Sequence, residues 1–194
     1  MIGRLFKYWV YGGFLAGIMI LALMPLLADG WSTTFTVIFV LLPIYMLHQY
    51  EEHDGDRFRL YINRTIGNGA EVLTPAAVFV INIGAVWILD VAVLYLAWTV
   101  DPGIGLVAVY LMLINAIVHI VGAIRSGSYN PGLVTAVALF LPFGGYAWWR
   151  IQISGAATAV EHIVGLSIGI AVHAIIVAYA LRRRSALASL KLRR

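Results

Sequence analysis

Two histidines and two glutamates lie within six residues of this sequence, in the stretch HQYEEH at positions 48–53. The stretch ends an apolar run, FTVIFVLLPIYML, that is long enough to lie inside a membrane. Residues three and four apart share one face of a helix, so Glu51 and Glu52 lie on the same stripe as His48, with Tyr45 one turn earlier. Ionisable groups inside a span are costly and usually mark a site or a pathway. This stripe is therefore the first candidate site.

A second apolar run carries NAIVH at 115–119, which places Asn115 and His119 on one helical face. His48 and His119 each lie six residues from the inner end of their helix, or roughly 9 Å at 1.5 Å per residue. His173 lies about 13 Å from the inner end of its own helix by the same measure. We therefore expect these imidazoles to share one layer.

Histidine and carboxylate side chains at this spacing suit a divalent metal. Zinc often takes three protein ligands and leaves a position for water, and two histidines with one carboxylate also suit non-haem iron. We predict that His48, Glu52 and His119 are metal ligands. Glu51 is predicted to act as general base on the bound water, although the two glutamates can exchange these roles. Asn115 is expected to orient a ligand or to polarise a substrate carbonyl.

Other polar residues are expected to line or cover the same pocket. Tyr129 is counted with the catalytic residues, and the predicted substrate-pocket residues are Tyr45, Asn82, Asn130 and His173. The alternative for Tyr129 and Asn130 is a plain turn, because Asn-Pro-Gly is turn chemistry. The alternative for Asn82, and for His162 near the outer end of the last helix, is a satisfied hydrogen bond between helices.

Two other functions remain open from these residues. A hydrogen-bonded His–Glu pair can move a proton without a metal, so a metal-free acid–base isomerase is an alternative. A small proton, cation or lipid carrier is another, favoured by Asp90 and His162, which extend polarity outward. The lack of an inverted repeat or of a pair of broken helices weighs against a carrier.

The composition defines the setting for these side chains. The 194 residues are 62% hydrophobic and 11% charged, which is too apolar for a soluble domain of this size. There is no cysteine, which excludes disulfides and thiolate chemistry. The net charge of +4 is unevenly distributed, and we interpret it as a topology signal rather than a nucleic-acid signal.

The sequence predicts an all-α, polytopic transmembrane bundle of six helices. A spanning helix needs about 20 apolar residues. Residues 1–181 are expected to form the bundle, 54–69 an amphipathic surface connector, and 182–194 a basic cytoplasmic tail. The six predicted spans are about 8–28, 32–53, 71–99, 103–125, 132–150 and 158–181.

The basic residues predict the orientation. Of the 13 Lys and Arg residues, only Arg150 falls on the outer side of this arrangement, which predicts that both termini are cytoplasmic. We expect a multi-pass protein of a cell membrane, with the bacterial inner membrane as the location. The expected partners are membrane lipid and a hydrophobic small molecule, and no nucleic acid.

Three motifs also carry a resemblance to a known family. HQYEE at 48–52, NAIVH at 115–119 and SYNPGLVTA at 128–136 resemble the HXXEE family of small bacterial membrane proteins, over roughly residues 35–180. The resemblance supports the site and implies no reaction. The function expected from the residues is a metal-dependent membrane hydrolase or oxygenase, with suspected zinc or iron, that acts on a lipid or another hydrophobic substrate.

Overall fold

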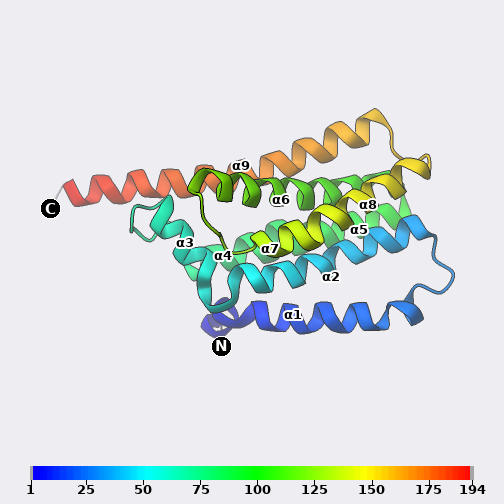
Figure 1. Cartoon of the computed structure of the whole chain (residues 1–194), viewed down its shortest axis with the longest axis horizontal. Helices are drawn as coiled ribbons and strands as arrows, with labels where there is room; N and C mark the ends of the chain where they lie inside the picture. The colour runs from blue at the N-terminus through cyan, green and yellow to red at the C-terminus, as the bar shows by residue number, and fades with distance from the viewer. Residues whose placement is uncertain (1, 193–194) are drawn as a thin grey trace.

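The computed structural model describes residues 2–192, and every regular element in that range is a helix (Figure 1). Six long helical segments run side by side, and η1 (Asp54–Asp56) and α3 (Arg57–Thr65) connect the second to the third. The elements of the six segments are α1 (Ile2–Leu27); α2 (Thr33–His53); α4, η2 and α5 (Pro75–Val80, Ile81–Ile88 and Leu89–Thr99); η3 and α6 (Pro102–Gly105 and Leu106–Ser126); α7, η4 and α8 (Leu133–Thr135, Ala136–Phe140 and Leu141–Ile153); and α9 (Ala159–Leu192).

Five of the segments are long and apolar enough to cross a membrane, which indicates a multi-pass membrane protein. These candidate spans are Ile2–Leu27, Thr33–Thr65, Pro75–Thr99, Pro102–Ser126 and Ala159–Leu190. The all-helical fold is thus confirmed, and all six predicted segments are helical, but the predicted span 132–150 is not among the candidates. That segment consists of α7, η4 and α8. It is less apolar than the five candidate spans because it contains Pro142, several glycines and Arg150. The orientation of the termini stays a prediction.

Local sequence explains where several helices begin and end. Ser32 caps α2 by accepting a hydrogen bond from the Phe35 amide, and Thr74 caps α4 in the same way from Ala77. Gly127 ends α6 in the left-handed conformation that glycine adopts without strain. These caps set the register of the helices that carry the polar motifs.

The helices α2 and α6 lie in the interior of the bundle. α2 packs against α1, α5, α6 and α8, and α6 also packs closely along α9. Glycines at 165 and 169 allow that close approach, because a side chain there would meet Tyr110 or the α6 backbone. The polar residues of α2 and α6 therefore face protein rather than lipid.

The connector forms a short helix across one end of the bundle, which we call the α3 end (Figure 1). Gly55 and Asp56 have positive φ angles of 60° and 67°, and they turn the chain sharply after α2. The Asn63 amide then joins the connector to the following loop through two hydrogen bonds with the Leu73 backbone. In Figure 1, α1 begins and α9 ends at this same end, and the predicted tail from residue 182 continues α9 as far as Leu192. Residues 193–194 of that tail lie outside the described residues.

Candidate metal centre

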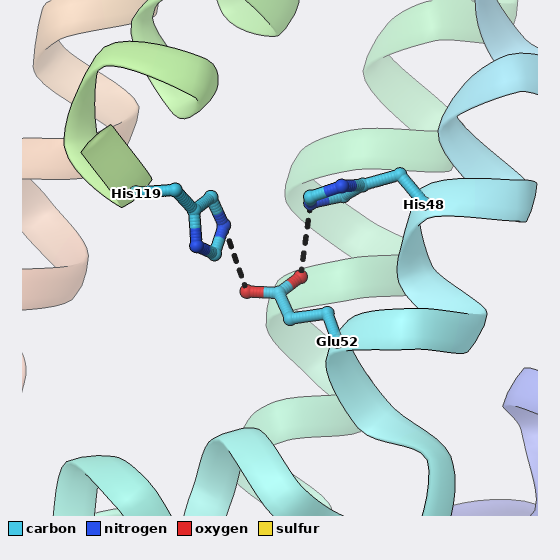
Figure 2. Close-up of side chains that lie close together, drawn as sticks. All are labelled: His48, Glu52 and His119. Carbon is cyan, nitrogen blue, oxygen red and sulfur yellow. Dashed lines mark ion pairs between the residues drawn. The ribbon is translucent and has the colours of Figure 1, made fainter. Parts of the chain in front are cut away.

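His48 and Glu52 of α2 meet His119 of α6 near the α3 end of the bundle (Figure 2). The Nε2 atom of His48 lies 3.7 Å from Glu52 Oε2, and the Nε2 atom of His119 lies 3.5 Å from Glu52 Oε1. One potential ligand atom from each residue falls within 4.8 Å of the other two. All three are buried, with exposed fractions of 0%, 5% and 5%. The predicted convergence of two helices on one site is therefore present.

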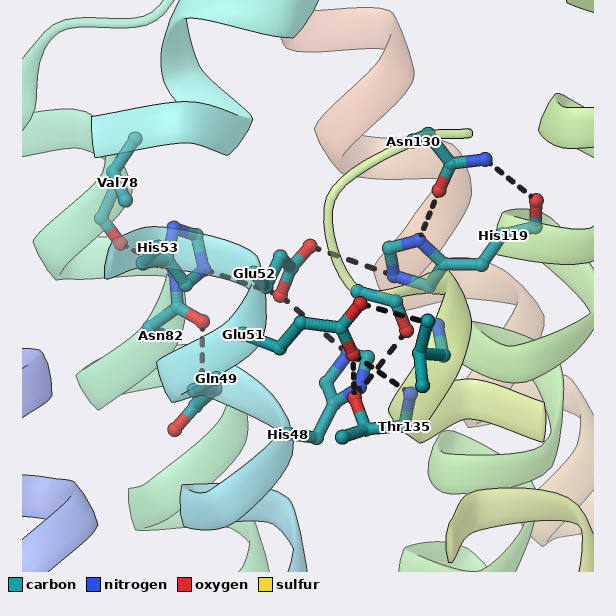
Figure 3. A network of polar contacts seen from close by, with 12 residues as sticks. His48, Gln49, Glu51, Glu52, His53, Val78, Asn82, His119, Asn130 and Thr135 are labelled. Atoms are coloured by element: carbon teal, nitrogen blue, oxygen red, sulfur yellow. Dashed lines mark hydrogen bonds and ion pairs between the residues drawn. The ribbon is translucent and has the colours of Figure 1, made fainter. Parts of the chain in front are cut away.

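Hydrogen bonds on the far side of His48 determine which ring nitrogen carries the proton (Figure 3). The Thr135 hydroxyl donates its one hydrogen to Glu51 Oε2. It can therefore only accept from His48 Nδ1, which lies 2.8 Å away. His48 is thus protonated on Nδ1, and its Nε2 lone pair points toward Glu52.

His119 is oriented in the same way by Asn130. The Asn130 amide nitrogen donates to the backbone carbonyl of His119 over 2.8 Å, which identifies the other amide atom as the oxygen. That oxygen lies 2.7 Å from His119 Nδ1 and must accept its hydrogen. In the neutral imidazole, the Nε2 lone pair of His119 is therefore also directed at Glu52.

When both imidazoles are neutral, two Nε2 lone pairs and a carboxylate therefore face one another. The separations of 3.5 and 3.7 Å exceed the roughly 2.7–3.2 Å of an N–H···O hydrogen bond. Ligand atoms on a shared tetrahedral zinc lie about 3.3 Å apart, given bonds of about 2.0–2.2 Å. The outer partners Thr135 and Asn130 are of the kind that orient metal-bound histidines. The residues fit a divalent cation.

Gly132 provides the space between the two rings. Its φ angle is +99°, and a Cβ atom built there would lie 2.6 Å from His119 Cε1 and 3.0 Å from His48 Cε1. No other residue type fits this position without moving the imidazoles. The Asn-Pro-Gly turn is therefore part of the site as well as a turn.

Glu51 faces away from Glu52 and binds the start of the fifth helical segment. Its Oε1 accepts from the Tyr129 hydroxyl at 2.8 Å and the Val134 amide at 3.1 Å, and its Oε2 accepts from the Thr135 amide at 2.7 Å as well as from the Thr135 hydroxyl. A carboxylate is favoured at a helix N-terminus, where amides are free. Burial, followed by the hydrogen bond to Glu51, raises the pKa of Tyr129 above its ordinary value. These contacts support a positioning role for both side chains.

His53 also lies beside the centre, although it is five residues from His48 and therefore on a different face of an ideal helix. It is buried, and its Nε2 lies 3.2 Å from Glu52 Oε2 without a hydrogen-bond partner of good geometry in the described part of the chain. Its ring packs against Trp9 and Phe58. The sharp turn at Gly55 and Asp56 folds α3 back over this ring and so keeps His53 inside.

The remaining predicted residues differ in their distance from the centre. The Tyr45 ring lies edge-on to the His48 ring, 6.0 Å between centroids, and Asn115 lies one turn from His119 on the same face of α6. Asn82 accepts from Gln49 and donates to the Val78 carbonyl, so it forms a complete link between α2 and the third segment.

His173 lies on α9 and is less closely tied to the cluster. Its Nδ1 bonds to the Gly169 carbonyl of its own helix. Tyr45 and Asn115 thus extend the cluster along α2 and α6. The hydrogen bonds of Asn82 and His173 are instead made to residues outside the cluster.

The sequence analysis did not single out Thr135, Gly132 or Gln49. Thr135 and Gly132 lie inside the quoted stretch SYNPGLVTA, so their place in a shared motif was an available signal. Gln49 joins Asn82 to the Trp87 indole, which donates to the Gln49 carbonyl oxygen at 2.6 Å. A glutamine between a histidine and a tyrosine carries no comparable signal.

A comparison with known protein families supports the importance of these motifs. Residues 39–147 match the family described as a protein of unknown function with HXXEE motif, which is more than half of the chain. The chain belongs to the HXXEE family. The match is narrower than the predicted 35–180, and it contains the three ligand residues and the whole 128–136 turn. No curated protein and no solved structure matches the chain.

Each position of the HXXEE motif has a distinct place in this structure. His48 and Glu52 contribute to the candidate metal centre, and Glu51 holds the start of α7. The two intervening residues face elsewhere: Gln49 bonds to Asn82, and the Tyr50 ring stacks on Phe14 of α1. The HXXEE motif thus combines two candidate ligands with the carboxylate that positions a third helix beside them.

Proposed function

We propose that this HXXEE protein is a membrane-embedded, metal-dependent enzyme that acts on a lipid or another hydrophobic molecule. The metal is zinc or iron, held by His48, Glu52 and His119. The observation that carries the proposal is the convergence of two imidazole Nε2 atoms and one carboxylate at 3.5 and 3.7 Å, beyond hydrogen-bond distance, with both Nδ1 atoms bonded to outer partners. When bound, a divalent metal supplies a Lewis acid that polarises a substrate oxygen.

The protein's own residues prepare the ligands. Thr135 and Asn130 accept the Nδ1 hydrogens, so the neutral imidazoles turn their Nε2 lone pairs toward the site. Glu51 fixes Thr135 in turn, through both the hydroxyl and the backbone amide. The arrangement is built before any ligand arrives, which lowers the reorganisation that binding requires.

The position of the cluster supports a hydrophobic substrate. The two histidines lie in two candidate spans, roughly 9 Å from the α3 end by helical rise, and Glu52 lies one turn nearer that end. The basic residues predict that this end faces the cytoplasm, so the proposed site belongs to the inner leaflet of the bacterial inner membrane. Lipids and other apolar molecules reach that depth easily.

A metal-free acid–base enzyme is the second candidate, because His53 Nε2 lies 3.2 Å from Glu52 Oε2. A His–Glu pair at this distance can pass a proton to or from a bound molecule. In this case Glu52 is the essential group, and the two Nε2 lone pairs serve as proton acceptors.

The test compares lipid conversion by the parent and by Glu52→Gln, reconstituted in vesicles of bacterial lipid extract and followed by mass spectrometry. We expect the zinc- or iron-loaded parent to convert a lipid, and both chelation and Glu52→Gln to abolish this. The control Glu161→Gln changes a half-buried carboxylate at the opposite end of the bundle and should convert at the parent rate. Conversion that survives chelation but not Glu52→Gln would favour the acid–base enzyme. Stoichiometric metal without any conversion would contradict the lipid-enzyme proposal.

A further inference from the structure

Asp90 is a buried carboxyl that the candidate metal centre does not use. It lies in α5, within the candidate span Pro75–Thr99, nine residues before the end of that span and so roughly 13 Å from it. Its exposed fraction is 4%. Within the described residues, neither of its carboxyl oxygens has a hydrogen-bond partner.

The surroundings of Asp90 are apolar. Val86, Val93 and Ala97 are buried on the same face of the helix and belong to the main hydrophobic core, together with Tyr45 of α2. The described residues form neither a salt bridge nor a hydrogen bond with the carboxyl group of Asp90. A lone carboxylate in such a place is far more costly than a neutral carboxylic acid. The group therefore requires a proton or a bound cation.

Tyr45 links this apolar core to the metal centre. It belongs to the same buried cluster as Val86 and Val93, and its ring contacts the His48 ring edge-on. The core that surrounds Asp90 therefore extends to the metal centre through Tyr45.

We propose that Asp90 is a proton-binding site in the membrane core, separate from the His48–Glu52–His119 centre and one side chain, Tyr45, removed from it. The ligand is a proton, and the carboxyl is neutral in the resting protein. Such a group can give or take a proton within reach of the centre without contact with bulk water. The proposal does not depend on a metal, because it rests on the burial and missing partners of Asp90 itself.

Infrared spectroscopy of the reconstituted protein at neutral pH tests this directly, because a neutral carboxylic acid and a carboxylate absorb at different frequencies. We expect the parent to show an acid C=O band that is lost in Asp90→Asn. The control Asp29→Asn removes an exposed carboxylate in the α1–α2 loop and should leave that band unchanged. Zinc content should be the same in Asp90→Asn and in the parent, which separates this proposal from the metal proposal.

A second measurement avoids any substitution. In parent protein with carboxyl-13C-labelled aspartate, the acid band should shift to lower frequency, whether or not Asp90→Asn folds. An acid band that neither shifts with the label nor disappears in Asp90→Asn would overturn the proposal. Aspartate absorption confined to carboxylate bands would overturn it as well, and would indicate a bound cation instead.

Discussion

Histidines lie in polar networks at both ends of the bundle, and only one network is complete. At the end opposite α3, His162 donates from Nε2 to the Gln152 side-chain oxygen and accepts at Nδ1 from the Tyr110 hydroxyl, each at 2.9 Å. That hydroxyl in turn accepts from the Trp148 indole. At the α3 end, His48 and His119 each have one hydrogen-bonded ring nitrogen, Nδ1. The other nitrogen of each ring, Nε2, faces the Glu52 carboxylate at 3.7 and 3.5 Å, beyond hydrogen-bond distance. A complete network links helices, whereas convergent acceptors without a donor form a place for a cation.

The largest expected difference between the two ends is in metal content. His48→Ala should bind no zinc or iron under conditions in which the parent binds one per chain, because one of three ligands is lost. His162→Ala should bind as much as the parent. Mass spectrometry of the metal content, with thermal melting as the check on folding, makes the comparison. Equal metal content in the two variants would remove His48 from the ligand set.

The next effect separates two glycines of one loop. Gly132→Ala should weaken zinc binding by more than about 100-fold, because its Cβ would intrude between the two imidazoles. Gly127→Ala is the matched control, since it also has a positive φ of 61° but nothing within 4 Å of the added Cβ. It should cost only about 1–2 kcal/mol of backbone strain and leave zinc affinity unchanged. Competition titration against a zinc chelator measures both affinities, and similar affinities would contradict the role of Gly132.

A smaller effect is expected from the residue that holds His48. Thr135→Val removes the hydroxyl between His48 Nδ1 and Glu51 and should weaken zinc binding by about 10- to 100-fold, with the stoichiometry retained at high zinc. Thr99→Val removes a hydroxyl that bonds only to its own helix and should not change the affinity. The same titration would count against the orienting role if Thr135→Val bound zinc as tightly as the parent.

The smallest effect belongs to the complete network. Tyr110→Phe removes the side-chain hydrogen bonds to His162 and from Trp148, and should lower the free energy of unfolding by about 1 kcal/mol, at an average of about 0.6 kcal/mol for each such bond in membranes. Metal content should not change. Unfolding in mild detergent measures the change in the free energy of unfolding. A loss of metal from this variant would mean that the two ends of the bundle are coupled.

Much of this arrangement follows from periodicity in the sequence. Apolar segments of spanning length predict the helices, and the i, i+4 spacing of His48 and Glu52 predicts a shared face. Helical rise places His119 at the same depth. Each of these features depends on one helix at a time, which is why the sequence alone predicts them.

The choice between Glu51 and Glu52 could not be made in this way. Both lie on the same stripe, and the difference arises when Val134 and Thr135, more than 80 residues away, bond to Glu51. The inward position of His53 likewise depends on two consecutive positive φ angles, at Gly55 and Asp56. Contacts distant in sequence and unusual backbone angles leave no trace in hydrophobic periodicity.

X-ray absorption spectroscopy at the metal edge tests the central claim most directly, because it counts the imidazole ligands of the bound ion. The zinc-loaded parent should show the scattering pattern of two imidazoles together with oxygen ligands. His119→Ala, where it retains any zinc, should show no more than one imidazole, and His162→Ala should match the parent. A parent spectrum without imidazole scattering, or one that His119→Ala leaves unchanged, would contradict a metal centre shared between α2 and α6.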